Sequence, residues 1–279
     1  MLKIEHLTKK YDQYKAVDDL SLEIDDGLIY GFIGHNGAGK TTTLKSVVGI
    51  LPFDEGDIFI DGKSIKKNPL ECKKEMAYIP DNPDLYEYLT GIQYLNFVAD
   101  VYQVSKNDRE ARIAKFADML ELTDDLAQPI SAYSHGMKQK LAVISAFIHN
   151  PKLIIMDEPF VGLDPKASHL LKQLMKEHCQ QGGAIFFSTH VLEVAEKLCD
   201  RIAIIKQGKL IISGRTQDVT QNESLNKSNV PSAEFYQTSA GFASLTNSAY
   251  STLRELYLSL IHISYSVSMN KSYKATISM

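Results

Sequence analysis

The sequence lacks the features of an exported or membrane-embedded protein. It has no tryptophan and only three cysteines in 279 residues. Cys72, Cys179 and Cys199 form no CxxC pair and have no histidine in ligand register, which predicts free thiols in a reducing compartment. No run of about 18 apolar residues is present, so no membrane-spanning helix is expected. The first six residues have no signal-peptide pattern. We therefore expect a soluble chain that meets a membrane only through a partner.

An excess of one charge is also missing. The chain has 30 Lys and Arg residues against 34 Asp and Glu residues, a net charge of -4. Such a chain has no general attraction to phosphate backbones, so we expect no nucleic-acid partner. The 44% of hydrophobic residues is enough to bury the core of one large domain or two small ones.

Apolar runs of strand length alternate with segments of helix length over most of the chain. Several runs are apolar almost throughout, as expected of strands buried on both faces of a parallel sheet. The expected strands are 28–34, 76–80, 153–157, 184–188, 202–205 and 210–212, and the expected helices are 40–49, 165–181 and 191–199. This alternation predicts an α/β domain that binds its ligand at the carboxyl ends of the strands.

Two stretches break the alternation. Between about residues 86 and 148, apolar residues recur at helical spacing, which predicts a mainly helical insert. After about residue 219 the composition turns to Ser, Asn and Thr with few charges, which predicts little regular structure. We therefore expect one domain over residues 1–218 and a Ser/Asn-rich tail over 219–279. Residues 258–263 resemble the translation of a sequencing adaptor, so the end of the tail is either native or an assembly artefact.

A glycine-rich segment follows the first buried apolar run. Residues 34–41 match the pattern G-x-x-x-x-G-K-[ST] between an expected strand and an expected helix. In this arrangement backbone N–H groups and the helix dipole point at phosphate oxygens. Lys40 is expected to reach the β- and γ-phosphates and Thr41 to hold Mg²⁺, whereas a glycine-rich turn with an exposed lysine is the alternative. The predicted ATP-binding residues here are Gly34, His35, Asn36, Gly37, Ala38, Gly39, Lys40, Thr41 and Thr42.

Two adjacent acids end another apolar run. Four apolar residues precede Asp157 and Glu158, as expected of a buried strand whose carboxyl end faces a nucleotide. We expect Asp157 to bind Mg²⁺, directly or through water. Glu158 is the expected general base for the water that attacks the γ-phosphate. An acidic pair that only starts a loop is the alternative, and the phosphate-binding pattern favours the catalytic interpretation.

The pattern of residues 133–139 identifies a protein family more specifically than the glycine-rich segment or the acidic pair does. Their sequence, Tyr-Ser-His-Gly-Met-Lys-Gln, lies about twenty residues before the Asp-Glu pair and resembles the Leu-Ser-Gly-Gly-Gln signature motif of ABC ATPases. Tyr133, His135 and Met137 depart from the motif, whereas Ser134 and Gly136 match it. The resemblance implies that Ser134 and Gly136 address the phosphates of ATP. An ordinary serine-capped helix is the alternative.

Further segments follow in the order of the ABC family. By this resemblance Tyr11 stacks on adenine, with Tyr14 as second choice and a surface tyrosine as the alternative. Residues 161–164, Val-Gly-Leu-Asp, resemble the loop that crosses the dimer interface, and Asp164 is its matching acid. His190 resembles the switch histidine that contacts the γ-phosphate, although a lone histidine is usually structural.

Asp81 marks a departure from the family pattern. The family normally has a glutamine at this position, where it joins Mg²⁺ and the lytic water to the transmembrane partner. Some ABC ATPases that resemble bacterial export systems carry an acid there. Asp81 is therefore a candidate magnesium ligand, and the substitution favours export over import.

The resemblance covers about residues 2–217 and implies a P-loop NTPase core of the ABC ATPase type. It implies an antiparallel β edge near the N-terminus and a helical lobe over about residues 86–148. It also implies an ATPase that uses ATP and Mg²⁺ and pairs head to tail with a second ATP-binding subunit, identical or different. ATP-driven closure of this dimer would power a separate transmembrane permease at the cytoplasmic face of the cell membrane.

Two other functions fit parts of the sequence. A soluble ABC ATPase acting on DNA or the ribosome would carry a long coiled coil or a second cassette, and the sequence has neither. A non-catalytic nucleotide sensor is suggested by Asp81 and His135. The intact Lys40, Glu158 and His190 favour the catalytic alternative.

Overall fold

The computed structural model describes residues 1–221, which form two β-sheets and the helices that pack around them. The strands are β1 (Leu2–Tyr11), β2 (Tyr14–Ile24), β3 (Ile29–Ile33), β4 (Glu55–Ile60), β5 (Lys63–Ser64), β6 (Met76–Ile79), β7 (Leu153–Asp157), β8 (Ala184–Thr189), β9 (Arg201–Lys206) and β10 (Lys209–Arg215). The helices are α1 (Lys40–Val47), α2 (Pro69–Lys74), α3 (Gly91–Val101), α4 (Lys106–Met119), α5 (His135–Ile148), α6 (Pro165–Gln180), α7 (Leu192–Leu198) and α8 (Thr216–Gln221), with 3₁₀ turns at Thr123–Asp125 and Ile130–Ala132. The expected mixed α/β class is confirmed.

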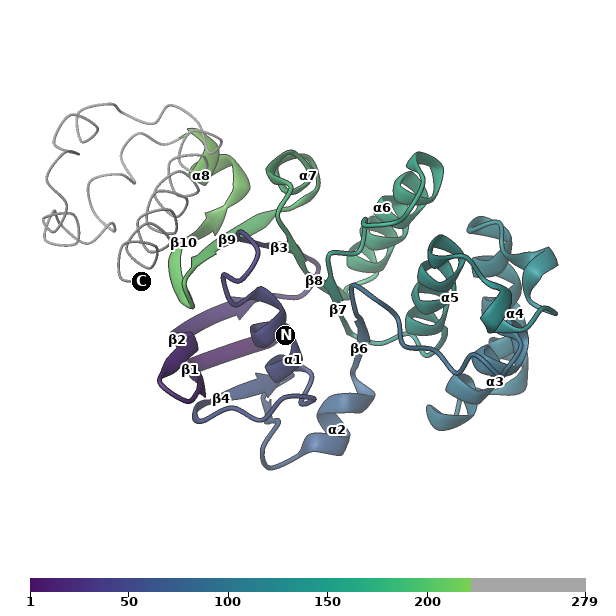
Figure 1. Ribbon diagram of the computed structural model, residues 1–279, viewed down its shortest axis with the longest axis horizontal. Coiled ribbons are helices and arrows are strands. Elements are labelled where there is room, and N and C mark those ends of the chain that lie inside the picture. Colours follow the sequence, from purple (N-terminus) through teal and green to yellow (C-terminus); the bar gives the residue numbers. More distant parts are fainter. Residues whose placement is uncertain (222–279) are drawn as a thin grey trace, which may run out of the picture.

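The larger sheet has six strands in the order β10-β9-β3-β8-β7-β6. Its strands from β9 to β6 are parallel, and β10 pairs antiparallel with β9. The smaller sheet is antiparallel, with the order β2-β1-β4-β5, and Figure 1 shows α1 beside it. In the larger sheet β3, β8 and β7 are direct neighbours, so their carboxyl ends meet at one edge.

Side chains of the larger sheet alternate between two apolar cores. On one face, Tyr30, Ile155 and Phe186 pack in a core that includes α1 and the antiparallel sheet. On the other face, Met156 and Phe187 pack in a core that includes α5, α6 and α7. Because both faces are covered, these strands are apolar almost throughout, which is why the sequence revealed them.

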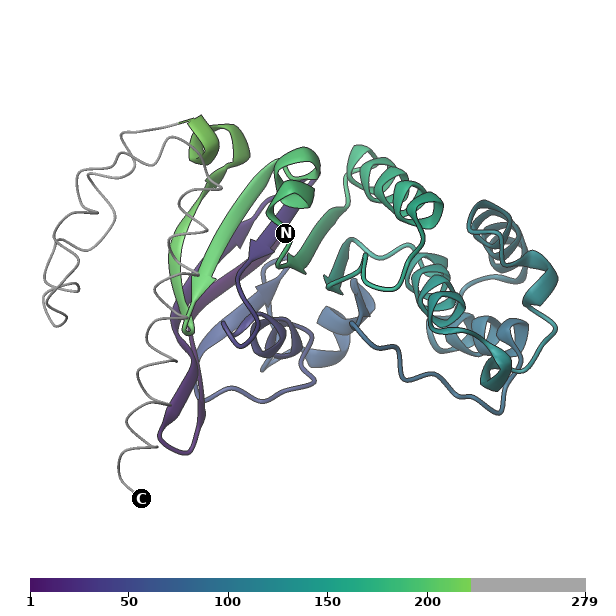
Figure 2. The ribbon, with the colours of Figure 1, turned by 45° about the horizontal axis from the view of Figure 1, so that its top comes forward.

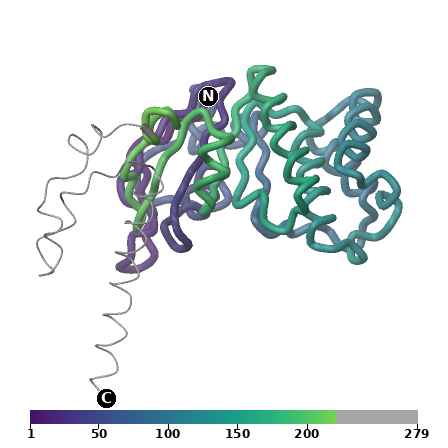
Figure 3. The backbone as a smooth tube through the Cα atoms, turned by 90° about the horizontal axis from the view of Figure 1, so that it is seen from above, coloured from purple at the N-terminus to yellow at the C-terminus, as the bar shows by residue number. Residues whose placement is uncertain are grey.

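Helices α3, α4 and α5 form a lobe at the end of the molecule away from β1 and β2 (Figures 2 and 3). Thr90 begins α3 with a capping box, in which its hydroxyl accepts from Gln93 N at 3.3 Å and Gln93 Oε1 accepts from Thr90 N at 2.9 Å. Ser105 caps α4 and Ser134 caps α5 in the same region. Side-chain caps satisfy N–H groups that the first helical turn leaves unpaired.

The structure continues past residue 218, where the sequence predicted the end of the domain. Helix α8 runs across that position, and Val219 is buried in the core on the α7 side of the sheet. Residues 222–279, including the adaptor-like run 258–263, lie outside the described residues. Within residues 1–221, no helix is both long and apolar enough to cross a membrane.

Candidate active site

The phosphate loop occupies residues 34–39, between the end of β3 and the start of α1, as the sequence predicted. A Cβ added at Gly34 would lie 2.7 Å from Ile205 O, and one at Gly39 would lie 2.4 Å from Ala16 O. Gly39 also has a φ of 107°. The loop backbone therefore lies so close to β9 and β2 that only glycine fits at these two positions.

Lys40 turns its side chain back into this loop. Its Nζ donates to Gly34 O at 2.6 Å and to His35 O at 3.3 Å, and the residue is 5% exposed. The ammonium group is thus held over the loop backbone, where phosphate oxygens would be bound. Thr41 and Thr42 follow in the first turn of α1 and are half-buried.

The two acids lie at the end of β7, the second strand along the sheet from β3. Asp157 is fully buried, and Ser188 Oγ on β8 donates a hydrogen bond to its Oδ1. Ser188 Oγ also accepts from Glu158 N at 3.0 Å. Glu158 has a φ of 47°, in the left-handed region that non-glycine residues rarely adopt. Ser188 therefore fixes both acids, in a role that we did not predict from the sequence.

Glu158 lies between Lys40 and His190. Its Oε1 is 3.3 Å from Lys40 Nζ, an ion pair without hydrogen-bond geometry, and its Oε2 is 3.0 Å from His190 Nδ1. The Lys40 and Glu158 side chains are 6% and 16% exposed, so water screens their attraction only weakly. The structure thus brings together three residues that are far apart in the sequence.

Asp157 offers an oxygen for a cation. Its Oδ2 is buried and has no hydrogen-bond partner within residues 1–221. An unpaired buried carboxylate oxygen is costly, and carboxylates are common Mg²⁺ ligands. The residues present therefore fit a divalent cation beside the phosphate loop.

Ser134 and Gly136 lie on a separate, exposed surface. Ser134 is the exposed N-cap of α5, and its Oγ accepts from Met137 N at 3.3 Å. A Cβ added at Gly136 would lie 3.1 Å from Gly162 O, and one at Gly162 would lie 2.4 Å from His135 Cδ2. The first residues of α5 therefore pack directly on the loop of residues 161–164. We call residues 134–136 and 161–164 the signature surface.

Asp164 ends this loop and begins α6. Its Oδ1 accepts from Ala167 N at 2.8 Å, which makes it the N-cap of the helix. This hydrogen bond, together with the positive charge of Lys140, lowers the pKa of the Asp164 carboxyl. Asp164 therefore caps α6 while the residue remains exposed at the signature surface.

The remaining predicted residues lie on the β1–β2 hairpin and in the loop after β6. Tyr11 ends β1, pairs with Tyr14 across the β1–β2 turn and is 48% exposed. The same hairpin reaches the phosphate loop through Ala16. Asp81 is exposed two residues after β6, and its Oδ1 accepts from Asn82 N at 2.9 Å. The Tyr11–Tyr14 pairing and the Asp81–Asn82 hydrogen bond are local contacts that do not identify a ligand of Tyr11 or Asp81.

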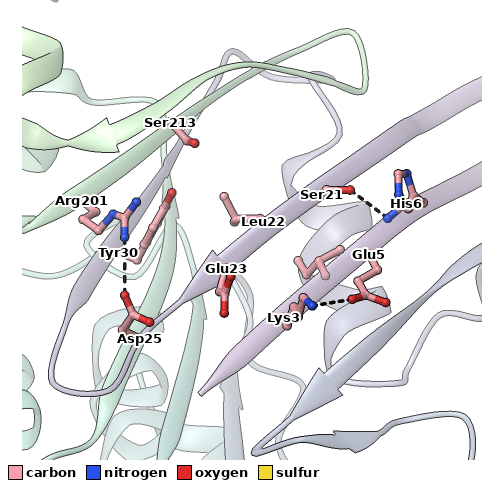
Figure 4. Close-up of a pocket in the computed structure, with 11 residues that line it drawn as sticks. Lys3, Glu5, His6, Ser21, Leu22, Glu23, Asp25, Tyr30, Arg201 and Ser213 are labelled. Carbon is pink, nitrogen blue, oxygen red and sulfur yellow. Dashed lines mark hydrogen bonds and ion pairs between the residues drawn. The ribbon is translucent and has the colours of Figure 1, made fainter.

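A groove of about 720 Å³ lies at the other end of the parallel strands (Figure 4). Four of its charged residues form two ion pairs, Lys3 with Glu5 at 2.6 Å and Arg201 with Asp25 at 3.5 Å. Tyr30, at the start of β3, also lines it. Ligands of parallel sheets bind at the carboxyl ends of the strands, so this groove is not the candidate active site.

Known proteins resemble this chain in sequence and in fold. The ABC transporter family model matches residues 17–161. The uncharacterized ABC transporter ATP-binding protein YhcH of Bacillus subtilis is 36% identical over 224 residues, which are 80% of this chain and 72% of that protein. The linearmycin resistance ATP-binding protein LnrL of the same organism is 33% identical over 78% of this chain and 70% of that protein. A solved ATP-binding subunit of an ABC transporter has 32% identity and a TM-score of 0.79, and the match covers 94% of this chain and 99% of that one.

This chain belongs to the ABC transporter ATP-binding proteins. It is therefore an ATPase with the P-loop fold of that family, as the resemblance implied.

Proposed function

We propose that the chain hydrolyses ATP with Glu158 as the general base and Lys40 as the phosphate ligand. The observation that carries this proposal is the contact series from Lys40 through Glu158 to His190, beside the buried Asp157. Lys40 Nζ would exchange the carbonyls of Gly34 and His35 for oxygens of the β- and γ-phosphates. Tyr11 would stack on the adenine ring from the adjoining hairpin.

Asp157 and Thr41 would hold the Mg²⁺ ion, with Asp81 as a further candidate ligand. The ion, when bound, neutralises charge on the β- and γ-phosphates. The unpaired Asp157 Oδ2 is the observation that supports this assignment.

Glu158 would accept a proton from the attacking water. A new bond then forms between that water oxygen and the γ-phosphorus, while the bond to the β–γ bridging oxygen breaks. His190 Nδ1, 3.0 Å from Glu158 Oε2, would orient the carboxylate and contact the γ-phosphate. The left-handed backbone at Glu158, fixed by Ser188, would keep the carboxylate between Lys40 and His190.

The second half of the site would come from another subunit. Ser134 and Gly136 are at the N-terminus of α5, where free N–H groups and the helix dipole favour phosphate. They lie on an exposed surface with Asp164, whereas Lys40 and Asp157 are buried. A head-to-tail dimer would place the signature surface of each subunit over the phosphate loop of the other.

A transmembrane permease at the cytoplasmic face of the membrane would be the third partner. The lobe exposes several aromatic side chains close together, since the rings of Tyr86 and Tyr88 lie 5.9 Å apart and those of Tyr86 and Phe97 lie 5.6 Å apart. Tyr88 is 80% exposed. Exposed apolar patches of this kind mark interaction surfaces. This patch follows Asp81 in the sequence, so residues 80–85 would connect a permease bound here to β6, the strand that pairs with β7.

Nucleotide-dependent association tests the dimer. A Glu158→Gln variant, which should bind ATP without hydrolysing it, is expected to double in mass by light scattering when ATP and Mg²⁺ are added. ADP should not have this effect, and a second substitution, Lys40→Ala, should abolish it. Tight ATP binding by a chain that stays monomeric would contradict the shared site.

A further inference from the structure

Tyr78 lies on the same face of the sheet as Asp157, on the neighbouring strand. In β6, Ala77 and Ile79 belong to the core on the α5 side, whereas Tyr78 packs against the core that contains α1. Tyr78 pairs with Ile155 of β7. Asp157 is two residues beyond Ile155 and so points to the same face. The tyrosine is therefore the diagonal neighbour of the buried carboxylate.

The hydroxyl group of Tyr78 is buried without a partner. No hydrogen bond to it is present within residues 1–221. Burial raises the pKa of Tyr78, and the negative charges of Asp157 and Asp81 raise it further. The phenol consequently stays protonated and lies within the electrostatic reach of both carboxylates.

Two unpaired buried polar atoms thus lie on one face of adjacent strands, Tyr78 Oη and Asp157 Oδ2. Leaving a buried polar group unpaired costs free energy, so native structures rarely do it without a functional reason. The two atoms do not bond to each other directly. A small polar species that contacts both would satisfy them.

We propose that Tyr78 is a positioning residue of the cation site, where its Oη accepts a hydrogen bond from a water ligand of the divalent cation held by Asp157. The inference rests on the proposed function, because it needs a cation at Asp157. Groups that orient the ligands of a metal typically change metal affinity by 10- to 100-fold when they are removed. Tyr78 would act on cation binding and not on the nucleotide directly.

The test compares nucleotide affinity with and without the cation. The dissociation constant of a non-hydrolysable fluorescent ATP analogue is measured in Mg²⁺ and in EDTA, and the ratio of the two values gives the Mg²⁺ enhancement. Tyr78→Phe should reduce the enhancement by about tenfold and leave the value in EDTA unchanged. Tyr30→Phe is the matched control, because Tyr30 is another tyrosine of this sheet, fully buried, but lies at the amino end of β3. It should keep the full enhancement.

Asp157→Asn separates this inference from the proposed function. If Asp157→Asn loses the enhancement and Tyr78→Phe retains all of it, the role of Tyr78 is wrong and the cation site stands. If Tyr78→Phe weakens binding equally in Mg²⁺ and in EDTA, the residue is only structural and the inference is again wrong. If the unchanged protein shows no enhancement and Asp157→Asn has no effect, the proposed cation site itself fails.

Discussion

The phosphate loop and the signature surface differ in how complete they are. Lys40 and Asp157 are buried, and Lys40 already has protein partners. Ser134 and Asp164, by contrast, are exposed, and their side chains cap their own helices. The first region is a preorganised half-site, whereas the groups proposed to bind phosphate on the signature surface face solvent. This difference supports the proposal that each subunit supplies one half of each shared site.

The largest effect is expected at the phosphate-loop half, where the chemistry takes place. Glu158→Gln should lower ATP turnover by about 10²- to 10⁴-fold, because it removes the proton acceptor, and should leave ATP binding intact. Steady-state hydrolysis and equilibrium nucleotide binding measure the two quantities. Glu193→Gln on α7 is the control, since that glutamate is exposed and has no proposed role in the site. Near-normal hydrolysis by Glu158→Gln would refute the assignment.

Lys40→Ala should weaken ATP binding itself. The substitution removes a charged hydrogen-bond donor worth about 1.5–3 kcal/mol, so affinity should fall by roughly 10- to 100-fold. Lys45→Ala serves as the control, because Lys45 is in the last turn of the same helix. Titration with a fluorescent nucleotide gives both values. Unchanged affinity in Lys40→Ala would mean that the loop does not hold the phosphates.

Gly162→Ala probes the packing within the signature surface. The added Cβ would meet His135 at 2.4 Å, and Gly162 has a φ of 80°. We expect a loss of roughly 1–3 kcal/mol in the free energy of unfolding, and a larger fall in ATPase activity than in ATP affinity. Gly182→Ala is the matched control, because it has a φ of 91° but no atom within 4 Å of its Cβ.

His135→Ala should relieve the clash in the Gly162→Ala background. Part of the ATPase activity should then return, whereas the strain from the left-handed backbone remains. If Gly162→Ala and Gly182→Ala have the same effect on ATPase activity, the contact between His135 and Gly162 plays no part in catalysis.

The smallest effect on ATPase activity is expected at a helix N-cap, and it is measured by comparing Ser134 with Thr90, the N-cap of another helix of the same lobe. Ser134→Ala and Thr90→Ala should each lower the free energy of unfolding by about 1 kcal/mol, because each removes an N-cap. Only Ser134→Ala should also reduce ATPase activity, by roughly 2- to 10-fold, since Ser134 is proposed to contact phosphate. Equal ATPase activity in both variants would reduce Ser134 to a structural cap.

The sequence predicted some parts of the phosphate-loop half better than others. Residues 34–41 were predictable because the loop, its lysine and the following helix are contiguous and their pattern carries the mechanism. Ser188 and Tyr78 were not, because their place beside Asp157 depends on the order and register of β6, β7 and β8. Register between strands that are far apart in the chain leaves no local pattern.

The antiparallel sheet, helix α2 and the signature surface were also predicted only in part from the sequence. We expected an antiparallel edge, but the bounds of β1 and β2 were not predicted, because register shifts interrupt the pairing of these strands. Helix α2 is only six residues long, too short for a clear periodic signal. His135, at the start of α5, lies close to Gly162 in the loop of residues 161–164. The two motifs are unrelated in sequence, so no pattern predicts that they meet.

Mixing two inactive variants tests most directly whether the two regions act between subunits. Lys40→Ala damages the phosphate loop, and Ser134→Arg places bulk and charge on the signature surface, so each homodimer has two damaged sites. A mixed dimer has one site with both lesions and one with neither. We predict that mixing the variants, with the permease present if dimerisation requires it, restores part of the ATPase activity. If each subunit were self-contained, every chain would keep its own lesion, and a mixture that forms dimers but shows no activity would contradict the account.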